Sequence, residues 1–341
     1  MKTKQSSNEL LKKILFEDNT LDNSNFKNIS LDHLIKTSTN HLVLPSLYYN
    51  IKKKKLKKKF PNDFIKYSKY IYKNNFKKNK SLILECKKIA SLFNKNNINY
   101  CFIKGASLLL CNVYQSIGER MIGDIDILVD SSQLIKAHSL LATMGYVSGG
   151  KYSYISSEFR YYDRQINKEN DVAIELHRRA IEIKKYEYLN SSDILANKHS
   201  LNNIYLPRID HMFLINIYSF QINDFGYFRL SYNYRNIYDS HLILKKLNGI
   251  SKIKFNKVIQ NYFIVCKFLN IRIINKIIKK SYLMLRLRFF LKNNFKTFRV
   301  FDDFITTQSV KTRYIRTKNF IQIFKNGHYR GYLIKKLTGD S

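Results

Sequence analysis

Two aspartates separated by one apolar residue are the side chains of this sequence best suited to chemistry. Asp124 and Asp126 open the segment 124–130, DIDILVD, whose apolar core predicts a β-strand. Side chains alternate between the two faces of a strand, so both carboxylates point to one face. Neighbouring carboxylates repel each other and lose hydration unless a cation neutralises them. Mg²⁺ is such a cation, and the pair therefore indicates phosphoryl or nucleotidyl transfer.

A third carboxylate lies on a later strand candidate, residues 171–177, DVAIELH. Alternation places Ala173, Glu175 and His177 on one face of that strand. If it lies in register beside the first strand, Glu175 joins Asp124 and Asp126 in a three-carboxylate site for two metal ions. His177 is more typical of an oriented or buried histidine than of a ligand.

These residues need a small α/β core to position them. Residues 99–103 predict a strand that ends in the turn Lys104-Gly105, and residues 106–115 predict a helix. A second helix is expected from a cap at Ser131 or Ser132 through Met144, before Gly145. Residues 152–163 and 171–177 predict further strands, separated by the polar turn 167–170.

The rest of the chain predicts helices. Apolar residues recur at helical spacing between residues 8 and 98, in 208–220 and 235–247, and in a very basic segment from about 250 to 341. We therefore expect an α+β protein with a small mixed β-sheet flanked by helical regions. The expected divisions are an N-terminal helical region (1–97), an α/β core (98–190) and a C-terminal basic helical region (191–341).

Several of these segments together resemble a known family. They are Ile103-Lys104-Gly105-Ala106, Tyr114, Arg120, the segment 124–129, Gly145-Tyr146 and the segment 174–177. The arrangement is similar to the bacterial "uncharacterised nucleotidyltransferase" family of the DNA polymerase β-like nucleotidyltransferase superfamily. The resemblance is strongest over residues 98–180 and weaker over about 30–245, where His211 and the segment 235–239 also look similar to family members. It implies that the core 98–190 is a nucleotidyltransferase core.

The resemblance implies roles for the acidic residues. Asp124, Asp126 and Glu175 would be the catalytic and metal-binding carboxylates, holding two Mg²⁺ ions, with Mn²⁺ as an alternative. Glu175 would position or activate the acceptor hydroxyl. The substrate would be an NTP, ATP by default, whose NMP passes to an unidentified acceptor such as a small-molecule or peptide biosynthetic intermediate.

One position departs from the family pattern, because Ala106 stands where a serine usually contacts phosphate. Nucleotide binding would then depend on backbone N–H groups after Gly105, helped by Lys104, Ser107 and Arg120.

Each of these residues also has a structural explanation. Lys104 could be a surface residue beside a turn, Arg120 could pair with Asp124 or Glu119, and Glu175 could pair with Arg178 or Arg179. Arg235 and Asp239, four residues apart, are more typical of a helix-surface pair than of a substrate contact. The tyrosines at 152, 154, 161 and 162 could stack on a base, although packing explains them as well.

The net charge of +35, from 60 Lys and Arg against 25 Asp and Glu, excludes an acidic or neutral surface. Either A/T-rich codon usage or binding to a polyanion explains it. The lysine run 51–60 is typical of a solvated surface, whereas residues 108–130 contain no Lys and only Arg120. Transfer onto RNA or protein, or a non-catalytic module that binds nucleic acid or a partner, therefore remain alternatives.

The remaining features exclude other classes. The four cysteines form no CxxC pair, which disfavours a zinc site or a disulfide framework and predicts buried, reduced thiols. No GxSxG, GxxxxGK[ST] or GxGxxG sequence is present, so hydrolase, P-loop and Rossmann classes are disfavoured. The sequence shows neither a signal-peptide pattern nor an apolar run long enough for a membrane span, and we expect a cytoplasmic protein.

Overall fold

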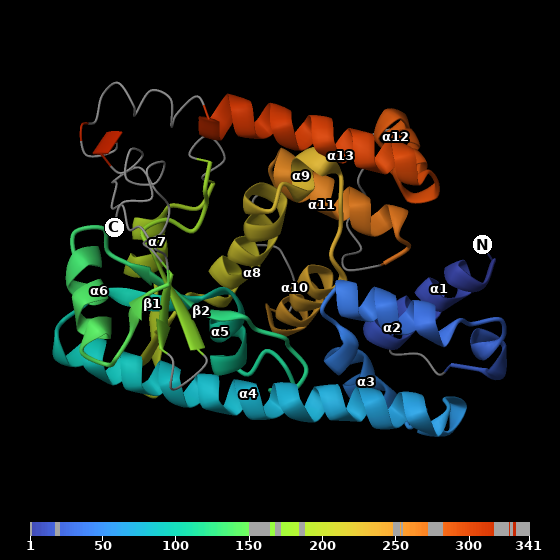
Figure 1. Cartoon of the computed structure of the whole chain (residues 1–341), viewed down its shortest axis with the longest axis horizontal. Helices are drawn as coiled ribbons and strands as arrows, with labels where there is room; N and C mark the ends of the chain where they lie inside the picture. Colours follow the sequence, from blue (N-terminus) through green and yellow to red (C-terminus); the bar gives the residue numbers. More distant parts are fainter. Residues whose placement is uncertain are drawn as a thin grey trace.

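The structure is a computed structural model of the whole chain, shown in Figure 1. Its described residues are 2–17, 21–149, 164–167, 172–183, 188–247, 253, 255–271, 282–316, 327 and 330–331. The expected strand at 152–163 with its tyrosines, the expected turn at 168–170, Asp171 and much of the basic C-terminal segment lie outside these residues.

Helices form most of the described chain. They are α1 (Lys2–Phe16), α2 (Leu31–Asn40), α3 (Leu44–Lys53), α4 (Asn62–Lys95), α5 (Lys104–Leu110), α6 (Leu134–Ala142), α7 (Ser191–Ala196), α8 (Ile209–Tyr218), α9 (Gly226–Arg229), α10 (Tyr234–Leu247), α11 (Lys257–Phe268), α12 (Leu283–Asn294) and α13 (Lys296–Val310). Short 3₁₀ turns occur at Asn23–Phe26 and Lys57–Lys59, and π-helical turns at Ser219–Asn223 and Lys311–Arg316.

A five-stranded mixed sheet lies among these helices. Its strands are β1 (Tyr100–Ile103), β2 (Asp124–Val129), β3 (Val147–Ser148), β4 (Gln165–Asn167) and β5 (Val172–His177), in the spatial order β1-β2-β5-β4-β3. β2 is parallel to β5, and the other neighbours are antiparallel. A separate hairpin pairs β6 (His199–Leu201) with β7 (Ile204–Leu206). The expected α+β class and the expected adjacency of the two acidic strands are confirmed.

One apolar core connects the helices with the sheet. It extends from Leu10 in α1 to Val310 in α13 and includes the fully buried Ile125 and Ile127 of β2. All four cysteines are buried and unpaired, as expected. Figure 1 shows α4 along one edge of the molecule, passing both the helices α1–α3 and the sheet. The catalytic candidates on β2 therefore lie on a strand that is fixed by packing.

The helix after β1 is shorter than the sequence predicts. It ends at Leu110 instead of Gln115, because Asn112 adopts a left-handed conformation with a φ of 50°. The N–H of Asn112 then donates to the carbonyl of Leu109, and the N–H of Val113 donates to the carbonyl of Leu108. This pair of bonds is the Schellman motif that ends many helices.

Two further helix boundaries also differ. Ser132 does not cap α6; its N–H and hydroxyl both donate to Asp130 Oδ1, and the helix begins after Gln133. The helix expected over 208–220 ends at Tyr218 and continues as the π-helical turn Ser219–Asn223. Among the described residues, no helix has the length and apolar character needed to cross a bilayer.

Candidate active site

The parallel pairing of β2 with β5 brings an acidic cluster together. Asp126 on β2 lies in register with Glu175 on β5. His177, two residues further along β5, has its Nε2 2.7 Å from Asp126 Oδ1 and 3.5 Å from Glu175 Oε2. Asp126 and His177 are buried, and Glu175 is half-buried. Ligand atoms of these three residues lie within 4.8 Å of one another, so the group could hold a metal ion.

A lysine at the end of β1 provides a positive charge for this cluster. Ile103 on β1 is the register partner of Asp126, and Lys104 follows it with a left-handed φ of 53°. The Nζ of Lys104 lies 2.5 Å from Asp126 Oδ1. This backbone conformation is unfavourable for a residue with a Cβ, by about 1 kcal/mol. It is retained where it brings an ammonium group to a buried carboxylate.

The three carboxyl groups differ in how readily they lose a proton. Burial raises the pKa of Asp124, and repulsion from Asp126 and Glu175 raises it further. Burial would also raise the pKa of Asp126, but Lys104 and His177 outweigh it and hold that pKa far below its ordinary value. A hydrogen bond with His177 lowers the pKa of Glu175 against the effect of burial. Asp124 is thus the carboxylate whose charge is least compensated.

These donors fit a divalent cation. Carboxylate oxygens of Asp126 and Glu175 face one another across two strands, and Asp124 adds a third, poorly neutralised carboxylate on the same side of β2. The Lys104 ammonium neutralises Asp126 where a metal ion would do so. The closely spaced group found among the described residues contains His177 rather than Asp124. The sequence predicts Asp124 as the third ligand, and the geometry adds an imidazole nitrogen to the oxygen donors.

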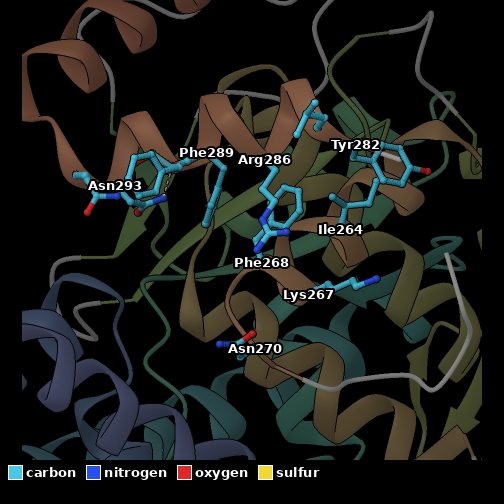
Figure 2. Close-up of a pocket in the computed structure, with 11 residues that line it drawn as sticks. Ile264, Lys267, Phe268, Asn270, Tyr282, Arg286, Phe289 and Asn293 are labelled. Carbon is cyan, nitrogen blue, oxygen red and sulfur yellow. Dashed lines mark hydrogen bonds between the residues drawn. The ribbon is translucent and has the colours of Figure 1, made fainter. Parts of the chain in front are cut away.

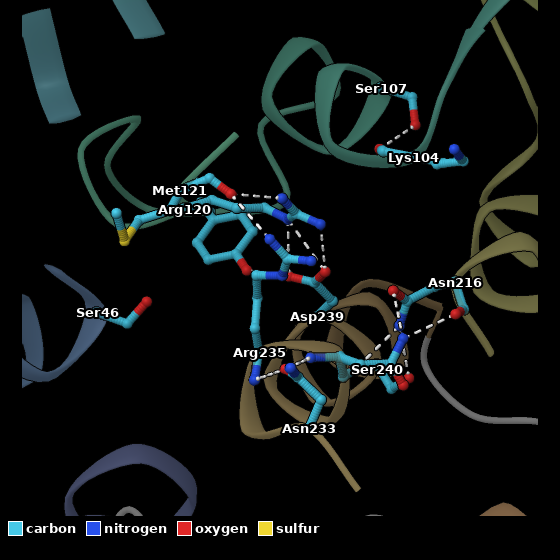
Figure 3. Close-up of polar contacts among 12 residues, drawn as sticks. Ser46, Lys104, Ser107, Arg120, Met121, Asn216, Asn233, Arg235, Asp239 and Ser240 are labelled. Carbon is cyan, nitrogen blue, oxygen red and sulfur yellow. Dashed lines mark hydrogen bonds and ion pairs between the residues drawn. The ribbon is translucent and has the colours of Figure 1, made fainter. Parts of the chain in front are cut away.

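A buried arginine, Arg120, binds a carboxylate of α10 (Figure 3). Arg120 Nη2 is 2.8 Å from Asp239 Oδ2, and its Nε also donates to that carboxylate at 3.0 Å. Arg120 Nη1 donates to the carbonyl of Met121 at 2.9 Å, and the Tyr114 hydroxyl donates to Asp239. Asp239 raises the pKa of Arg120 against the effect of burial, so the guanidinium keeps its charge.

A second guanidinium occupies the same corner. Arg235, one turn before Asp239 on α10, donates from Nη1 to the Met121 carbonyl at 3.4 Å. Burial lowers the pKa of Arg235, and repulsion from Arg120 lowers it further. Figure 3 shows the two guanidinium groups next to each other around Asp239. Asp239 pairs with Arg120 and acts on Arg235 only through its charge, so the two arginines keep an excess positive charge for an anion.

Gly105 is required for this arrangement. A Cβ built on Gly105 would lie 2.8 Å from Arg120 Nη1 and 3.1 Å from Ile122 Cγ1. The first distance is below any ordinary carbon–nitrogen contact, so a side chain here would displace the guanidinium. The glycine of the Lys104-Gly105 turn thus makes room for Arg120.

The acidic and basic groups line one cavity of about 230 Å³. Its walls come from the start of α5, from β2 and the residues just before it, from α8 and the π-helical turn that follows, and from α10. The lining residues are Lys104, Gly105, Arg120, Ile122, Gly123, Asp124, Asp126, Asn216, Ser219, Phe220, Asn223, Asp224, Asn233, Arg235, Asn236 and Asp239. The cavity therefore combines the two carboxylates of β2 with the guanidinium groups of Arg120 and Arg235.

Most of the site residues expected from the sequence meet here. Lys104, Gly105, Arg120, Asp124 and Asp126 line the cavity, and Glu175 lies in register with Asp126. Ser107 does not line it; its hydroxyl is bound to the carbonyl of Lys104 at 2.8 Å in the buried first turn of α5.

Two structural interpretations from the sequence are wrong. Arg120 pairs with Asp239 rather than with Asp124 or Glu119. Arg235 and Asp239 are not a surface pair, because Asp239 is 1% exposed and both residues line the cavity. Their spacing of four residues is a signal for this site, but it places them on one helix face without showing that the face is buried.

No sequence pattern marks the amide side of the cavity. Asn216 on α8 and Asn236 on α10 are buried against each other, each donating from Nδ2 to the other's main-chain carbonyl. Asn216 also donates to the hydroxyl of Ser240 at 2.9 Å. Isolated asparagines in amphipathic helices carry no recognisable signal, so only the structure shows that they fix α8 against α10.

Paired carboxylates on a β-strand that share a small cavity with buried cations are typical of phosphoryl- and nucleotidyl-transfer sites. The profile of the family described as "uncharacterised nucleotidyltransferase" matches residues 27–255, and the chain belongs to this family. The resemblance seen in the sequence is thereby confirmed, and nucleotidyl transfer is supported as the general activity. No curated protein matches the chain.

Proposed function

We propose that the protein transfers NMP from an NTP to an acceptor hydroxyl in a divalent-metal-dependent reaction. The observation that carries this proposal is the cavity itself, where Asp124 and Asp126 face Arg120 and Arg235. A metal–triphosphate complex requires two kinds of side chain in one site, carboxylates that bind the metal and cations that bind the phosphate oxygens. Neither side of the cavity alone would favour this ligand over a simple cation or anion.

Asp124, Asp126 and Glu175 are the proposed metal-holding residues, with His177 orienting Asp126 and Glu175. A bound Mg²⁺ or Mn²⁺ would supply charge neutralisation at the reacting phosphate and lower the pKa of an acceptor hydroxyl. Glu175 is more exposed than Asp126, with its side chain 19% exposed against 6%. We therefore propose Glu175 as the carboxylate that accepts a hydrogen bond from the incoming hydroxyl.

The basic residues have separate proposed tasks. Arg120 is fixed by Asp239 and the Met121 carbonyl, so it can present a preorganised charge to the phosphates. Arg235 has one long hydrogen bond, to Met121, among its described contacts and can give that up for a phosphate oxygen. Lys104 lines the cavity beside Asp126, which is one of the proposed metal-holding residues. Asp239 and Tyr114 are positioning residues that hold Arg120.

For the acceptor, we propose a small molecule or a peptide biosynthetic intermediate, with ATP as the first donor to test. The described cavity of about 230 Å³ is somewhat smaller than the roughly 300–1,000 Å³ usual for small-molecule sites, which favours a small acceptor over RNA or a folded protein. Transfer onto RNA or protein, and a non-catalytic role, are outcomes that the following experiment separates.

The test is release of pyrophosphate from each NTP with Mg²⁺, measured with pools of hydroxyl-bearing small molecules, peptides or RNA. Thermal unfolding with and without Mg²⁺ and NTP gives a second readout, because a ligand of the folded state raises its stability. We expect Asp126→Asn to lower turnover by about 10²–10³-fold and to remove the Mg²⁺-dependent stabilisation.

The matched control is Asp130→Asn, which removes the same charge from the end of the same strand. The amide of this variant keeps an acceptor oxygen for the Ser132 bonds that Asp130 now accepts. The control should therefore behave as the parent protein. Full turnover in a folded Asp126→Asn variant would exclude the metal assignment. Mg²⁺- and NTP-independent binding of RNA would favour the non-catalytic alternative.

A further inference from the structure

Exposed apolar side chains of the described chain concentrate on α12 and α13, which do not line the active-site cavity. Of the eighteen large hydrophobic side chains that are exposed among the described residues, nine lie between residues 283 and 305. They are Leu283, Met284, Leu287, Phe290, Phe295, Val300, Phe301, Phe304 and Ile305. Such a concentration marks an interaction surface rather than the scattered exposure that is normal for soluble proteins.

These side chains form continuous helix faces. On α12, Leu283, Leu287 and Phe290 follow the i, i+4, i+7 spacing of one face, whereas Phe289 points into the core. On α13, Phe301, Phe304 and Ile305 follow the i, i+3, i+4 spacing. Figure 1 shows α12 and α13 together along the edge of the molecule opposite α4. We call this surface the α12–α13 face.

Ion pairs hold the two helices together and use all of their acidic residues. Arg288 contacts Asp302 at 2.8 Å, and Lys292 contacts Asp302 at 2.8 Å and Asp303 at 2.5 Å. Residues 282–316 contain only these two acidic residues against eight Lys and Arg, a formal charge of +6. Exposed Arg286, Lys296 and Arg299 have no carboxylate within 4 Å among the described residues. The face therefore combines apolar stripes with cations that are available for an external anion.

A cavity of about 600 Å³ between α11 and α12 opens at the same surface (Figure 2). Its walls include the aromatic rings of Phe268 and Phe289, with Lys267 and Arg286 among the lining residues. It shares Leu283, Arg286 and Phe290 with the α12–α13 face. Within the described part of the chain, no Asp or Glu lines this cavity. Apolar walls beside cations suit a ligand with a hydrocarbon chain and an anionic group.

Charge decides between the possible occupants of the face. A second copy of the chain would bring one surface of formal charge +6 against another, which repels. A nucleic acid would pair with the cations and could stack its bases on the exposed phenylalanines, but it would leave the aliphatic side chains such as Leu283, Leu287 and Val300 in water. An anionic phospholipid surface satisfies both groups, since acyl chains receive the apolar side chains and headgroups pair with Lys and Arg. Long basic side chains on an apolar helix face reach such headgroups easily.

We propose that the α12–α13 face docks the protein on anionic phospholipid membranes. The helices lie along the surface of the bilayer, with their exposed phenylalanines among the acyl chains and Arg286, Lys296 and Arg299 at the headgroups. This association is peripheral and independent of the chemistry proposed for the cavity at β2.

Flotation of the full-length protein with vesicles tests this proposal. One vesicle preparation is phosphatidylcholine alone, and the other is an equal mixture of phosphatidylcholine and phosphatidylglycerol. We expect binding to the mixed vesicles, weakened by added salt, and little binding to phosphatidylcholine. The double variant Phe301→Asp/Phe304→Asp should lower the apparent affinity by at least about ten-fold, because two aromatic side chains no longer enter the bilayer.

The matched control is Tyr67→Asp/Tyr70→Asp, which adds the same two charges at exposed aromatic positions of α4. It should bind as the parent protein does. A second variant, Arg286→Gln/Arg299→Gln, leaves the apolar stripes intact and should reduce the preference for phosphatidylglycerol. The proposal is overturned if the parent protein binds neither vesicle, or if the α4 control loses as much affinity. It is also overturned if light scattering shows a dimer that the phenylalanine variant converts to monomer.

Discussion

Asp239 determines how the two guanidinium groups of the active-site cavity differ. It accepts hydrogen bonds from Arg120 Nε and from Tyr114, so its carboxylate is committed to one arginine. Arg235 lies close enough to Arg120 for repulsion to lower its pKa, and its described hydrogen bond is a long one. A buried charge with few hydrogen bonds is costly, and a phosphate oxygen would relieve that cost.

Replacing Arg235 therefore tests phosphate binding with little disturbance of the fold. We expect Arg235→Ala to raise the KM for the NTP by about 10–100-fold, the value of a charge-assisted hydrogen bond of about 1.5–3 kcal/mol. The metal-dependent stabilisation by Mg²⁺ alone should persist, because the described contacts of Arg235 include none of the carboxylates of β2 and β5. Steady-state kinetics and Mg²⁺-dependent thermal unfolding measure the two effects.

The control for this change is Arg208→Ala, whose guanidinium pairs with Asp210 on the exposed start of α8. Its removal should change neither KM nor kcat. An Arg235→Ala variant with the parent KM and a lowered unfolding midpoint would assign Arg235 to the fold rather than to the substrate.

Helix α4 has a function that its amphipathic pattern does not reveal. Two buried asparagines one turn apart, Asn75 and Asn79, both donate to the carbonyl of Arg120, at 2.9 Å and 2.7 Å. Asn75 also donates to the carbonyl of Gly118 at 2.8 Å, and Ser46 of α3 donates to the carbonyl of Glu119 at 2.9 Å. The N-terminal helices thus fix the loop that carries Arg120.

Asn79→Ala should loosen that loop without touching the cavity. The variant loses the bond from Asn79 to the Ile117 carbonyl and one of the two bonds to the Arg120 carbonyl, which costs about 1–3 kcal/mol of unfolding free energy. Because Arg120 would then be less rigidly placed, kcat should fall several-fold. The variants Asn79→Asp and Asn79→Leu should show the same loss of kcat, since neither an ionised carboxylate nor an alkyl group donates a hydrogen bond at that position. Denaturant unfolding and single-turnover rates are the measurements.

Asn94→Ala on the same helix is the matched control, because Asn94 donates to the remote carbonyl of Asn203 instead. Its rate should equal that of the parent protein. An equal loss of kcat in both variants would show that general softening of α4, rather than the Arg120 loop, is responsible.

At the level of elements, the sequence predicted what depends on local pattern. The strands at 100–103, 124–129 and 172–177 follow from their short apolar patterns. The sequence offers the pairing of the last two strands only as a condition, and the structure supplies the register of Asp126 with Glu175. Contacts between distant segments could not be predicted in this way. Arg120 and Asp239 are 119 residues apart, and no periodicity links two such positions. The roles of Asn75 and Asn79 depend equally on a fold that must already be known.

Positive charge lies mainly on the surface of the molecule, and the carboxylates of the site lie inside it. Lysines of the run 51–60 are mostly exposed, as the sequence predicted, whereas the carboxylates of β2 lie inside. An acidic centre within a positive envelope attracts a polyphosphate to the surface and a metal ion to the interior. This arrangement is compatible with any NTP, so the excess charge by itself selects no nucleic-acid partner.

Among the carboxylates inside this envelope, Glu119 couples the stability of the whole protein to pH. It is 1% exposed, accepts from the Ser116 N–H at 2.9 Å and lies 3.2 Å from the Tyr238 hydroxyl of α10. Burial raises its pKa to about 7 from an ordinary value of 4.5. The folded state therefore binds the Glu119 proton more tightly than the unfolded state does. The stabilisation that results is fully present below pH 4.5 and is lost as pH rises through about 7.

Glu119→Gln should remove this dependence, because the amide keeps an acceptor oxygen for the Ser116 N–H but does not titrate. The parent protein should lose about 3 kcal/mol more unfolding free energy than the variant as pH rises across that window. Denaturant unfolding of both proteins at a series of pH values measures the difference. Glu17→Gln, at an exposed glutamate, is the control for the loss of one charge. The contrary result is that the unfolding free energies of Glu119→Gln and of the parent change in parallel from acidic to alkaline pH. Glu119 would then not titrate in this window, and the loop between α3, α4 and α10 would hold it ionised throughout.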